Sequence, residues 1–139
     1  CHGGFSWRQA SVLCGNLVRV AGCDGLGWAA PGRYGALLGD DPRVRRVETA
    51  PGNEHVWHLY PVRVADRDRV LGALHAAGIG AAIHYPVPLH RQPALAGLDL
   101  GAHPVTEAAA DTMISLPLYP GITDDQQVRV VEALAGAMR

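Results

Sequence analysis

Lysine is absent from this sequence, and long apolar runs are absent with it. All 12 basic residues are arginine, and 13 acidic residues bring the formal net charge to −1. Such a balance excludes a general attraction to nucleic acid or to an anionic membrane. No apolar run approaches the roughly 20 residues of a membrane-spanning helix, and no basic signal-peptide start is present. We therefore expect a cytoplasmic protein without a nucleic-acid or membrane partner.

Cysteine is scarce and gathered at one end. Cys1, Cys14 and Cys23 are odd in number, and their spacing fits no zinc or redox motif. We interpret them as free thiols. The seven histidines leave a metal-binding role as a lesser alternative, which equilibrium dialysis against zinc would test. Because the sequence opens on Cys1 without a methionine, we expect it to be a piece of a longer protein.

The chain divides by composition into residues 1–39 and 40–139. Its 139 residues, 48% hydrophobic and 18% charged, suffice for one domain with a real core. Residues 1–39 hold nine of the 17 glycines, and Pro31 interrupts any long helix there. We expect a degenerate helical or linker segment in this part, with a weak helix over residues 7–21 and a helical turn over Arg33–Leu38.

From residue 40 onward the pattern predicts an α+β domain with a short, mostly antiparallel sheet covered by helices. Alternating or apolar runs predict strands over residues 44–49, 55–64, 79–85 and 114–119. Pro61 cannot donate a hydrogen bond to a neighbouring strand, so we expect it at a sheet edge or a bulge.

Three helices are predicted between or after these strands. Asp66 is expected to cap the first, and Gly78 to end it in a left-handed conformation. Pro104 fits the first turn of the second, which runs to about Thr112. Thr123 and Gln126 form a capping box for the third. Its expected buried stripe consists of Val128, Val131, Leu134 and Met138.

The segment IHYPVPLHRQP, residues 83–93, concentrates polar side chains between prolines. A stiffened segment after a strand is suited to binding a polar ligand, because its side chains lose little entropy when they bind. A proline-rich turn whose histidines satisfy local backbone groups is the competing interpretation, and spacing alone favours it. His55 and His58 would lie on opposite faces of a strand, so a shared metal is not expected there.

Motifs in the second half of the chain resemble those of one enzyme family. EHVWHLYPVRV is followed by GIGAAIHYPVPLH and then by ISLPLYPGITDDQQ, in the order and spacing of the DegT/StrS-type sugar aminotransferases. The resemblance covers residues 53–139. Gln9-Ala10 and Arg33-Tyr34 match two further markers of the family, which extends it weakly to about residue 9.

The resemblance implies the small C-terminal domain of a fold-type-I enzyme that uses pyridoxal 5'-phosphate (PLP). Such enzymes move an amino group onto a keto-sugar nucleotide in amino- and deoxy-sugar biosynthesis, and their active sites form at a homodimer interface. His84 and Tyr85 match the family's HYP motif, so a role in substrate binding is implied for both. The Asn-x-Arg of the family would fall on His2 and Gly4, which do not match it.

The absence of lysine bears on the aminotransferase activity that the resemblance implies. Transamination requires an amine that forms a Schiff base with PLP and then shuttles a proton. Arginine stays protonated and is no nucleophile at neutral pH. We therefore expect no cofactor binding and no turnover from this chain alone. The alternative is a non-catalytic binding or regulatory module that uses the IHYPVPLH loop. For a fragment separated from the rest of the enzyme we expect self-association or poor solubility, because the separation exposes an apolar patch.

Overall fold

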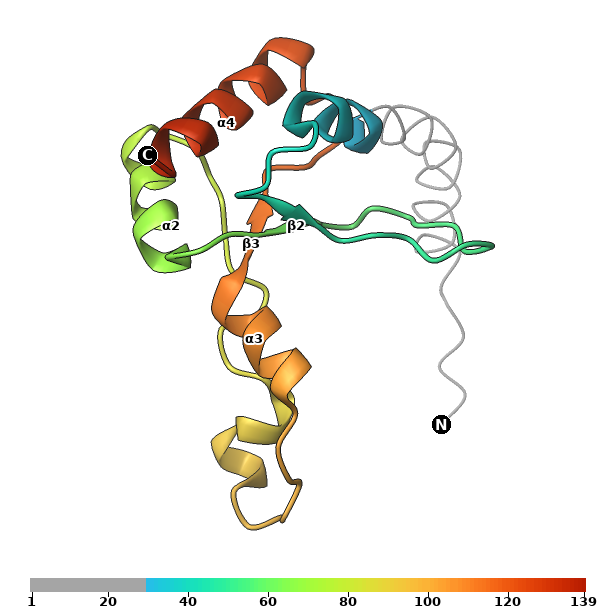
Figure 1. Cartoon of the computed structure of the whole chain (residues 1–139), viewed down its shortest axis with the longest axis vertical. Coiled ribbons are helices and arrows are strands. Elements are labelled where there is room, and N and C mark those ends of the chain that lie inside the picture. Colours follow the sequence, from blue (N-terminus) through green and yellow to red (C-terminus); the bar gives the residue numbers. More distant parts are fainter. Residues whose placement is uncertain (1–29) are drawn as a thin grey trace, which may run out of the picture.

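The computed structural model describes residues 30–139, and the expected helix over residues 7–21 lies outside them (Figure 1). Residues 30–38 are helical, as expected for Arg33–Leu38. The elements that follow are β1 (Arg45–Arg46), β2 (Tyr60–Arg63), α2 (Arg67–Ala76), η1 (Leu89–Arg91), η2 (Pro93–Leu95), α3 (Pro104–Thr112), β3 (Met113–Leu116) and α4 (Asp124–Ala137).

The sheet has three antiparallel strands in the order β1-β2-β3. The expected α+β class and the mostly antiparallel sheet are thus confirmed. Helices α2 and α4 pack against each other, and their apolar side chains share one core with β2 and β3. Pro61 lies in the central strand, not in an edge strand. It is tolerated there because β1 pairs only with Val62 and Arg63 and stops short of the proline.

Two predicted strands are much shorter than expected. The strand over residues 44–49 is reduced to Arg45–Arg46, and the one over residues 55–64 to Tyr60–Arg63. Trp57 explains the second difference, because its φ of 50° leaves the extended region. The Trp57 N–H donates to His55 Nδ1 at 2.8 Å, which closes a local turn instead of a strand. The expected alternation of His55 and His58 across a strand is therefore wrong.

The strand expected over residues 79–85 is also wrong. Only Ala82 pairs with the sheet, through an isolated antiparallel bridge to Ser115. Both backbone bonds of this bridge are short, with Ala82 N–H to Ser115 O at 3.1 Å and Ser115 N–H to Ala82 O at 2.8 Å. One residue of pairing still fixes this segment against β3, on the side that β2 leaves open.

Helix boundaries agree better with the predictions than the strands do. Helix α3 begins at Pro104 and ends at Thr112 as expected, and Gly78 has the left-handed φ of 74°. The capping box of Thr123 and Gln126 is present at the start of α4. Asp66 is the N-cap residue of α2, but its side chain makes no capping bond, so that part of the expectation is wrong.

The buried stripe of α4 includes Leu134 as predicted, but its other members are displaced by one residue from the predicted ones. Its buried members are Gln127, Val130, Leu134 and Ala137, whereas Val131 and Met138 are only partly buried. The apolar pattern missed Gln127 because it is polar. Its side chain is 1% exposed and donates to the carbonyl oxygen of Ala30 at 2.7 Å, which satisfies the buried amide.

Tyr34 joins the first described helix to the same core. It is fully buried, and its hydroxyl donates to the Pro117 carbonyl oxygen at 2.8 Å, where β3 ends. Burial raises the pKa of Tyr34 above its usual value. The end of β3 is therefore fixed by Tyr34 as well as by the Ala82 bridge, and this end carries the cavity described below.

Residues 85–112, which we term the arm, extend away from the core and contain η1, η2 and α3 (Figure 1). No side chain of the arm is buried. Six of the nine large apolar side chains that are exposed in residues 30–139 belong to it: Tyr85, Val87, Leu89, Leu98, Leu100 and Val105. Among the described helices, none is long and apolar enough to cross a membrane.

Candidate functional site

A cavity of about 470 Å³ opens where β3 ends, between the turn after α2 and the start of α4. This volume lies in the range of small-molecule sites. Its wall is largely apolar, with a few polar side chains contributed by His84, Ser115, Tyr119, Gln126 and Arg129. An apolar wall with few polar groups can bind a ligand and also fix its orientation.

His84 is positioned on this wall by Ser115. The His84 Nδ1 atom lies 3.0 Å from Ser115 Oγ, and Ser115 is itself only 4% exposed. The bridge between Ala82 and Ser115 fixes the two backbones that carry these side chains. The other ring nitrogen of His84 has no hydrogen-bond partner among residues 30–139, and His84 lines the cavity.

The remaining polar groups of the cavity are also held by neighbours. Arg129 Nη2 donates to the Ala77 carbonyl oxygen at 3.0 Å, beyond the end of α2. The Tyr119 hydroxyl donates to Gln126 Oε1 at 3.2 Å, and the same oxygen accepts from the Thr123 N–H at 2.8 Å. A guanidinium bonded through one nitrogen keeps further N–H donors for an oxygen-rich ligand.

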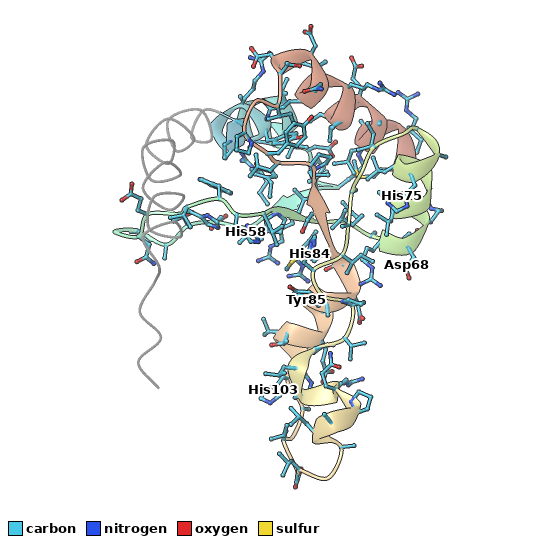
Figure 2. The ribbon with its side chains drawn as sticks, turned by 180° about the vertical axis from the view of Figure 1, so that it is seen from behind. His58, Asp68, His75, His84, Tyr85 and His103 are labelled. Atoms are coloured by element: carbon cyan, nitrogen blue, oxygen red, sulfur yellow. The ribbon has the colours of Figure 1, made fainter. Side chains whose placement is uncertain are left out.

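Tyr85 does not line this cavity. Its side chain is 76% exposed, and its ring meets that of His84 edge-on with centroids 5.7 Å apart (Figure 2). The peptide bond between the two residues is cis. The two residues of the HYP motif therefore differ in position: His84 belongs to the cavity, whereas Tyr85 begins the exposed surface of the arm.

His90 and Arg91 of the IHYPVPLHRQP segment meet at a separate place in the arm, whereas the Gln92 side chain donates to the Val87 carbonyl oxygen. His90 Nε2 donates to Glu107 Oε1 at 3.0 Å, and Arg91 Nη2 lies 2.8 Å from Glu107 Oε2. The hydrogen bonds from His90 and then from Arg91 lower the pKa of Glu107 below its usual value. This cluster connects η1 to the first turn of α3, so its role is to hold the arm together.

No grouping of three or more His, Cys, Asp or Glu side chains within residues 30–139 could hold a metal ion. His55 instead stacks on the Trp57 ring, with centroids 4.1 Å apart, and His58 is exposed. His90 and His103 rings meet edge-on at 4.6 Å, with Glu107 shared between His90 and Arg91. The cysteines, and with them any thiol ligand, lie outside the part of the chain that the structure describes.

Sequence reasoning missed Ser115 and Arg129 as members of the site. Ser115 lies in an apolar strand without the sequence context of a catalytic serine, so its residue type alone does not mark it as part of a site. Its contact with His84 spans 31 positions along the chain, so no local pattern shows it. The one available signal is that Ser115 occupies the ISLP stretch, which carries the family resemblance.

Comparison with known proteins gives a consistent result. The model of the DegT/DnrJ/EryC1/StrS aminotransferase family matches residues 6–135. A dTDP-3-amino-3,4,6-trideoxy-alpha-D-glucose transaminase from Streptomyces venezuelae is 37% identical over 128 residues, covering 91% of this chain and 34% of the relative. The enzyme of the same name from Micromonospora megalomicea is 42% identical over 132 residues, covering 91% of this chain and 35% of that relative. The chain thus spans about a third of the length of these relatives.

A solved structure shows the same fold. The S. venezuelae protein DesV, crystallised in complex with a ketimine intermediate, superimposes with a TM-score of 0.85 at 36% sequence identity. The match covers 94% of this chain and 36% of DesV. Both the sequence and the fold therefore match about a third of each of these longer proteins.

Proposed function

This chain belongs to the DegT/DnrJ/EryC1/StrS aminotransferase family, and we propose that it is the substrate-binding C-terminal part of a sugar aminotransferase, without turnover alone. Two relatives that it matches over nine-tenths of its length are named as dTDP-sugar transaminases, and a third is named as an aminotransferase of a UDP-linked sugar. On this proposal the cavity beside His84 receives the sugar of a nucleotide-linked keto-sugar. The observation that carries the proposal is the pair of His84 and Ser115, fixed on the wall of a cavity of about 470 Å³.

The residues of this chain do not fit covalent attachment of PLP. That attachment uses a side-chain amine that is a nucleophile when deprotonated, and lysine is absent from all 139 residues. The 12 arginines remain protonated and cannot replace it. We therefore assign no catalytic step to this chain and restrict its role to binding and orientation.

Binding would use the side chains that the fold already holds in place. The free ring nitrogen of His84 and the remaining N–H groups of Arg129 suit the hydroxyl and carbonyl oxygens of a sugar. Tyr119 and Gln126 add a hydroxyl and an amide at the far wall. Because these groups are positioned by hydrogen bonds before a ligand arrives, binding costs little additional side-chain entropy.

Calorimetric titration of the purified chain with dTDP-sugars and UDP-sugars tests this proposal. We expect saturable heat, weakened about tenfold in the His84→Ala variant, which is the loss expected when one hydrogen bond of about 1.4 kcal/mol is removed. His58→Ala is the matched control, because His58 is exposed and does not line the cavity. Absence of heat with the wild type, or equal weakening by both variants, would contradict the proposal.

A binding or regulatory module without catalysis is the second candidate. It is favoured by the lack of lysine together with the match to a Geobacillus stearothermophilus relative named a pleiotropic regulatory protein, 41% identical over 86 residues that cover 60% of this chain and 23% of the relative. The two candidates differ in one assay. Adding a lysine-bearing large domain of the same family should produce transamination if the chain is part of an enzyme, and none if it is a module.

A further inference from the structure

Two arginines face each other across the first pair of strands. In the antiparallel register of β1 and β2, Arg45 is the direct partner of Arg63. The Cβ atoms of directly opposed residues lie about 5 Å apart, and like charges in such positions destabilise a sheet. A guanidinium cannot relieve this repulsion by losing its proton. The pairing is therefore unfavourable in the free protein and becomes favourable if an anion lies between the two groups.

A cavity of about 410 Å³ lies at this pair of residues. Arg43 and Arg69 line it together with Arg45 and Arg63, and Asp66 is the one carboxylate in its lining. It shares no lining residue with the cavity beside His84. Four of the 12 arginines of the chain thus surround a single concave space.

The positive charge of this cavity is only partly neutralised. Asp41 forms two bonds with Arg43, from Nε at 3.0 Å and Nη2 at 2.6 Å, so its carboxylate is committed to that one guanidinium. Asp66 lies 3.9 Å from Arg69. Among residues 30–139, no ion pair reaches Arg45 or Arg63, and their two positive charges face the cavity without compensation.

The side chain of Arg63 is also held rigidly. Its Nε donates to Thr112 Oγ1 at 2.8 Å, and its Nη2 donates to the Ala108 carbonyl oxygen at 3.1 Å. Arg69 Nη1 likewise donates to the Ala137 carbonyl oxygen at 2.7 Å. A guanidinium has five N–H groups, so each of these side chains keeps unused donors. Groups that are already fixed lose little entropy when they bind a ligand.

We propose that this arginine-lined cavity is a binding site for phosphate groups, with Arg45 and Arg63 contacting the same phosphate. Guanidinium forks match the oxygens of phosphate in paired hydrogen bonds, and these charge-assisted bonds are about twice as strong as neutral ones. The cavity is large enough for a diphosphate or for a phosphate attached to a small organic group. Arg43 and Arg69 would contact the second phosphate or the organic group.

Thermal melting and calorimetry in chloride buffer test this site, with inorganic pyrophosphate and uridine diphosphate as separate probes at constant ionic strength. We expect saturable binding of pyrophosphate and a higher melting temperature in its presence. If pyrophosphate and uridine diphosphate bind with equal affinity, the site contacts only the phosphates. If uridine diphosphate binds more tightly, the site also contacts the nucleoside. Either result supports the site. Absence of saturable binding of both probes would overturn it.

Substitution of one of the paired arginines separates this site from general charge effects. Arg45→Gln should weaken pyrophosphate binding at least tenfold and should melt no lower than the wild type without phosphate, because it removes the repulsion with Arg63. Arg46→Gln is the matched control, since Arg46 carries the same charge on the same strand but does not line the cavity. Equal weakening by both variants would contradict the proposal. His84→Ala should bind pyrophosphate normally, which separates this test from the sugar titration.

Discussion

The contact between His84 and Ser115 shows how single residues define the candidate site. The two side chains meet at 3.0 Å on a cavity wall, although their segments are paired through only one backbone bridge. His84 belongs to a motif that the sequence reveals, but its partner and the open ring nitrogen follow from the fold. The position of the imidazole is therefore determined by a buried serine and not by the prolines that follow it.

Replacing Ser115 by alanine should release this imidazole. The Ser115→Ala variant loses one hydrogen bond, worth about 1 kcal/mol, so we expect a melting temperature lower by roughly 4 °C and nucleotide-sugar binding up to about fivefold weaker. The nitrogen signals of the His84 ring should change in NMR spectra, since Nδ1 loses its partner. Unchanged ring signals in the variant would show that Ser115 does not position His84.

Gln127 stabilises the fold through a buried side-chain hydrogen bond. Its buried amide bonds the carbonyl oxygen of Ala30 at 2.7 Å and joins α4 to the first described helix. Gln127→Leu should lower the free energy of unfolding by roughly 1–3 kcal/mol, because that carbonyl is left without its partner. Urea denaturation measures the change, with Gln92→Leu in the exposed arm as a control. A loss below about 0.5 kcal/mol would place the Gln127 variant among ordinary surface changes and contradict this account.

At the scale of elements, the arm is held together by ionic contacts and not by a core. None of its side chains is buried, and Glu107 connects α3 to η1 through His90 and Arg91. The pKa of Glu107 is lowered, so its ionised carboxylate stabilises the folded arm. This contribution to the stability of the arm is complete above the ordinary glutamate pKa of 4.5, and it is lost as the pH falls through the lowered pKa of Glu107.

Acidification should therefore loosen the arm before it unfolds the core. We expect amide exchange in residues 89–91 to stay slow at pH 5–7 and to accelerate, relative to the intrinsic rate, only below the ordinary glutamate pKa. Glu107→Gln should show the fast exchange at every pH, whereas Glu132→Gln, on exposed surface of α4, should behave as the wild type. Identical exchange profiles in Glu107→Gln and the wild type would contradict the assigned role.

The elements that could be predicted are those specified by local chemistry. Pro104 and the capping box of Thr123 and Gln126 mark helix starts through groups a few residues apart, and the structure has them where expected. The strand over residues 79–85 could not be predicted correctly, because a single bridge to Ser115 decides its conformation. The strand over residues 55–64 failed at Trp57, whose positive φ no alternation pattern reveals.

The candidate site was predictable to a similar extent. The HYP motif indicated His84, but it indicated Tyr85 equally, and only the fold separates the cavity from the exposed arm. Gln127 could not be predicted as a buried residue, because the buried face of α4 was predicted from apolar residues alone. Arg45 and Arg63 lie opposite each other because of the register between β1 and β2. No local pattern in the sequence shows this register, so the pair could not be predicted.

At the scale of the whole molecule, the arm exposes large apolar side chains. Tyr85, Leu89 and Val105 are each at least 76% exposed. Exposed apolar side chains of this size are often found at protein interfaces, and we propose that a second copy or the remainder of an aminotransferase covers them.

Analytical ultracentrifugation measures whether the isolated chain self-associates. We expect the isolated chain to self-associate in a concentration-dependent manner, and we expect Leu89→Glu combined with Val105→Glu to shift it toward the monomer. The same two changes should leave the melting temperature nearly unchanged, since neither side chain is in the core. A wild-type chain that sediments as a monomer at all concentrations would contradict this expectation.

The central claim is that these residues bind the sugar substrate of an aminotransferase without providing its cofactor lysine. A titration of the isotopically labelled chain with a dTDP-sugar, followed by NMR, tests it most directly. The largest shifts should fall on the His84 cavity, in residues 78–84, 115–119 and 126–130. Absence of shifts up to millimolar ligand, or shifts confined to residues outside this cavity, would contradict the claim.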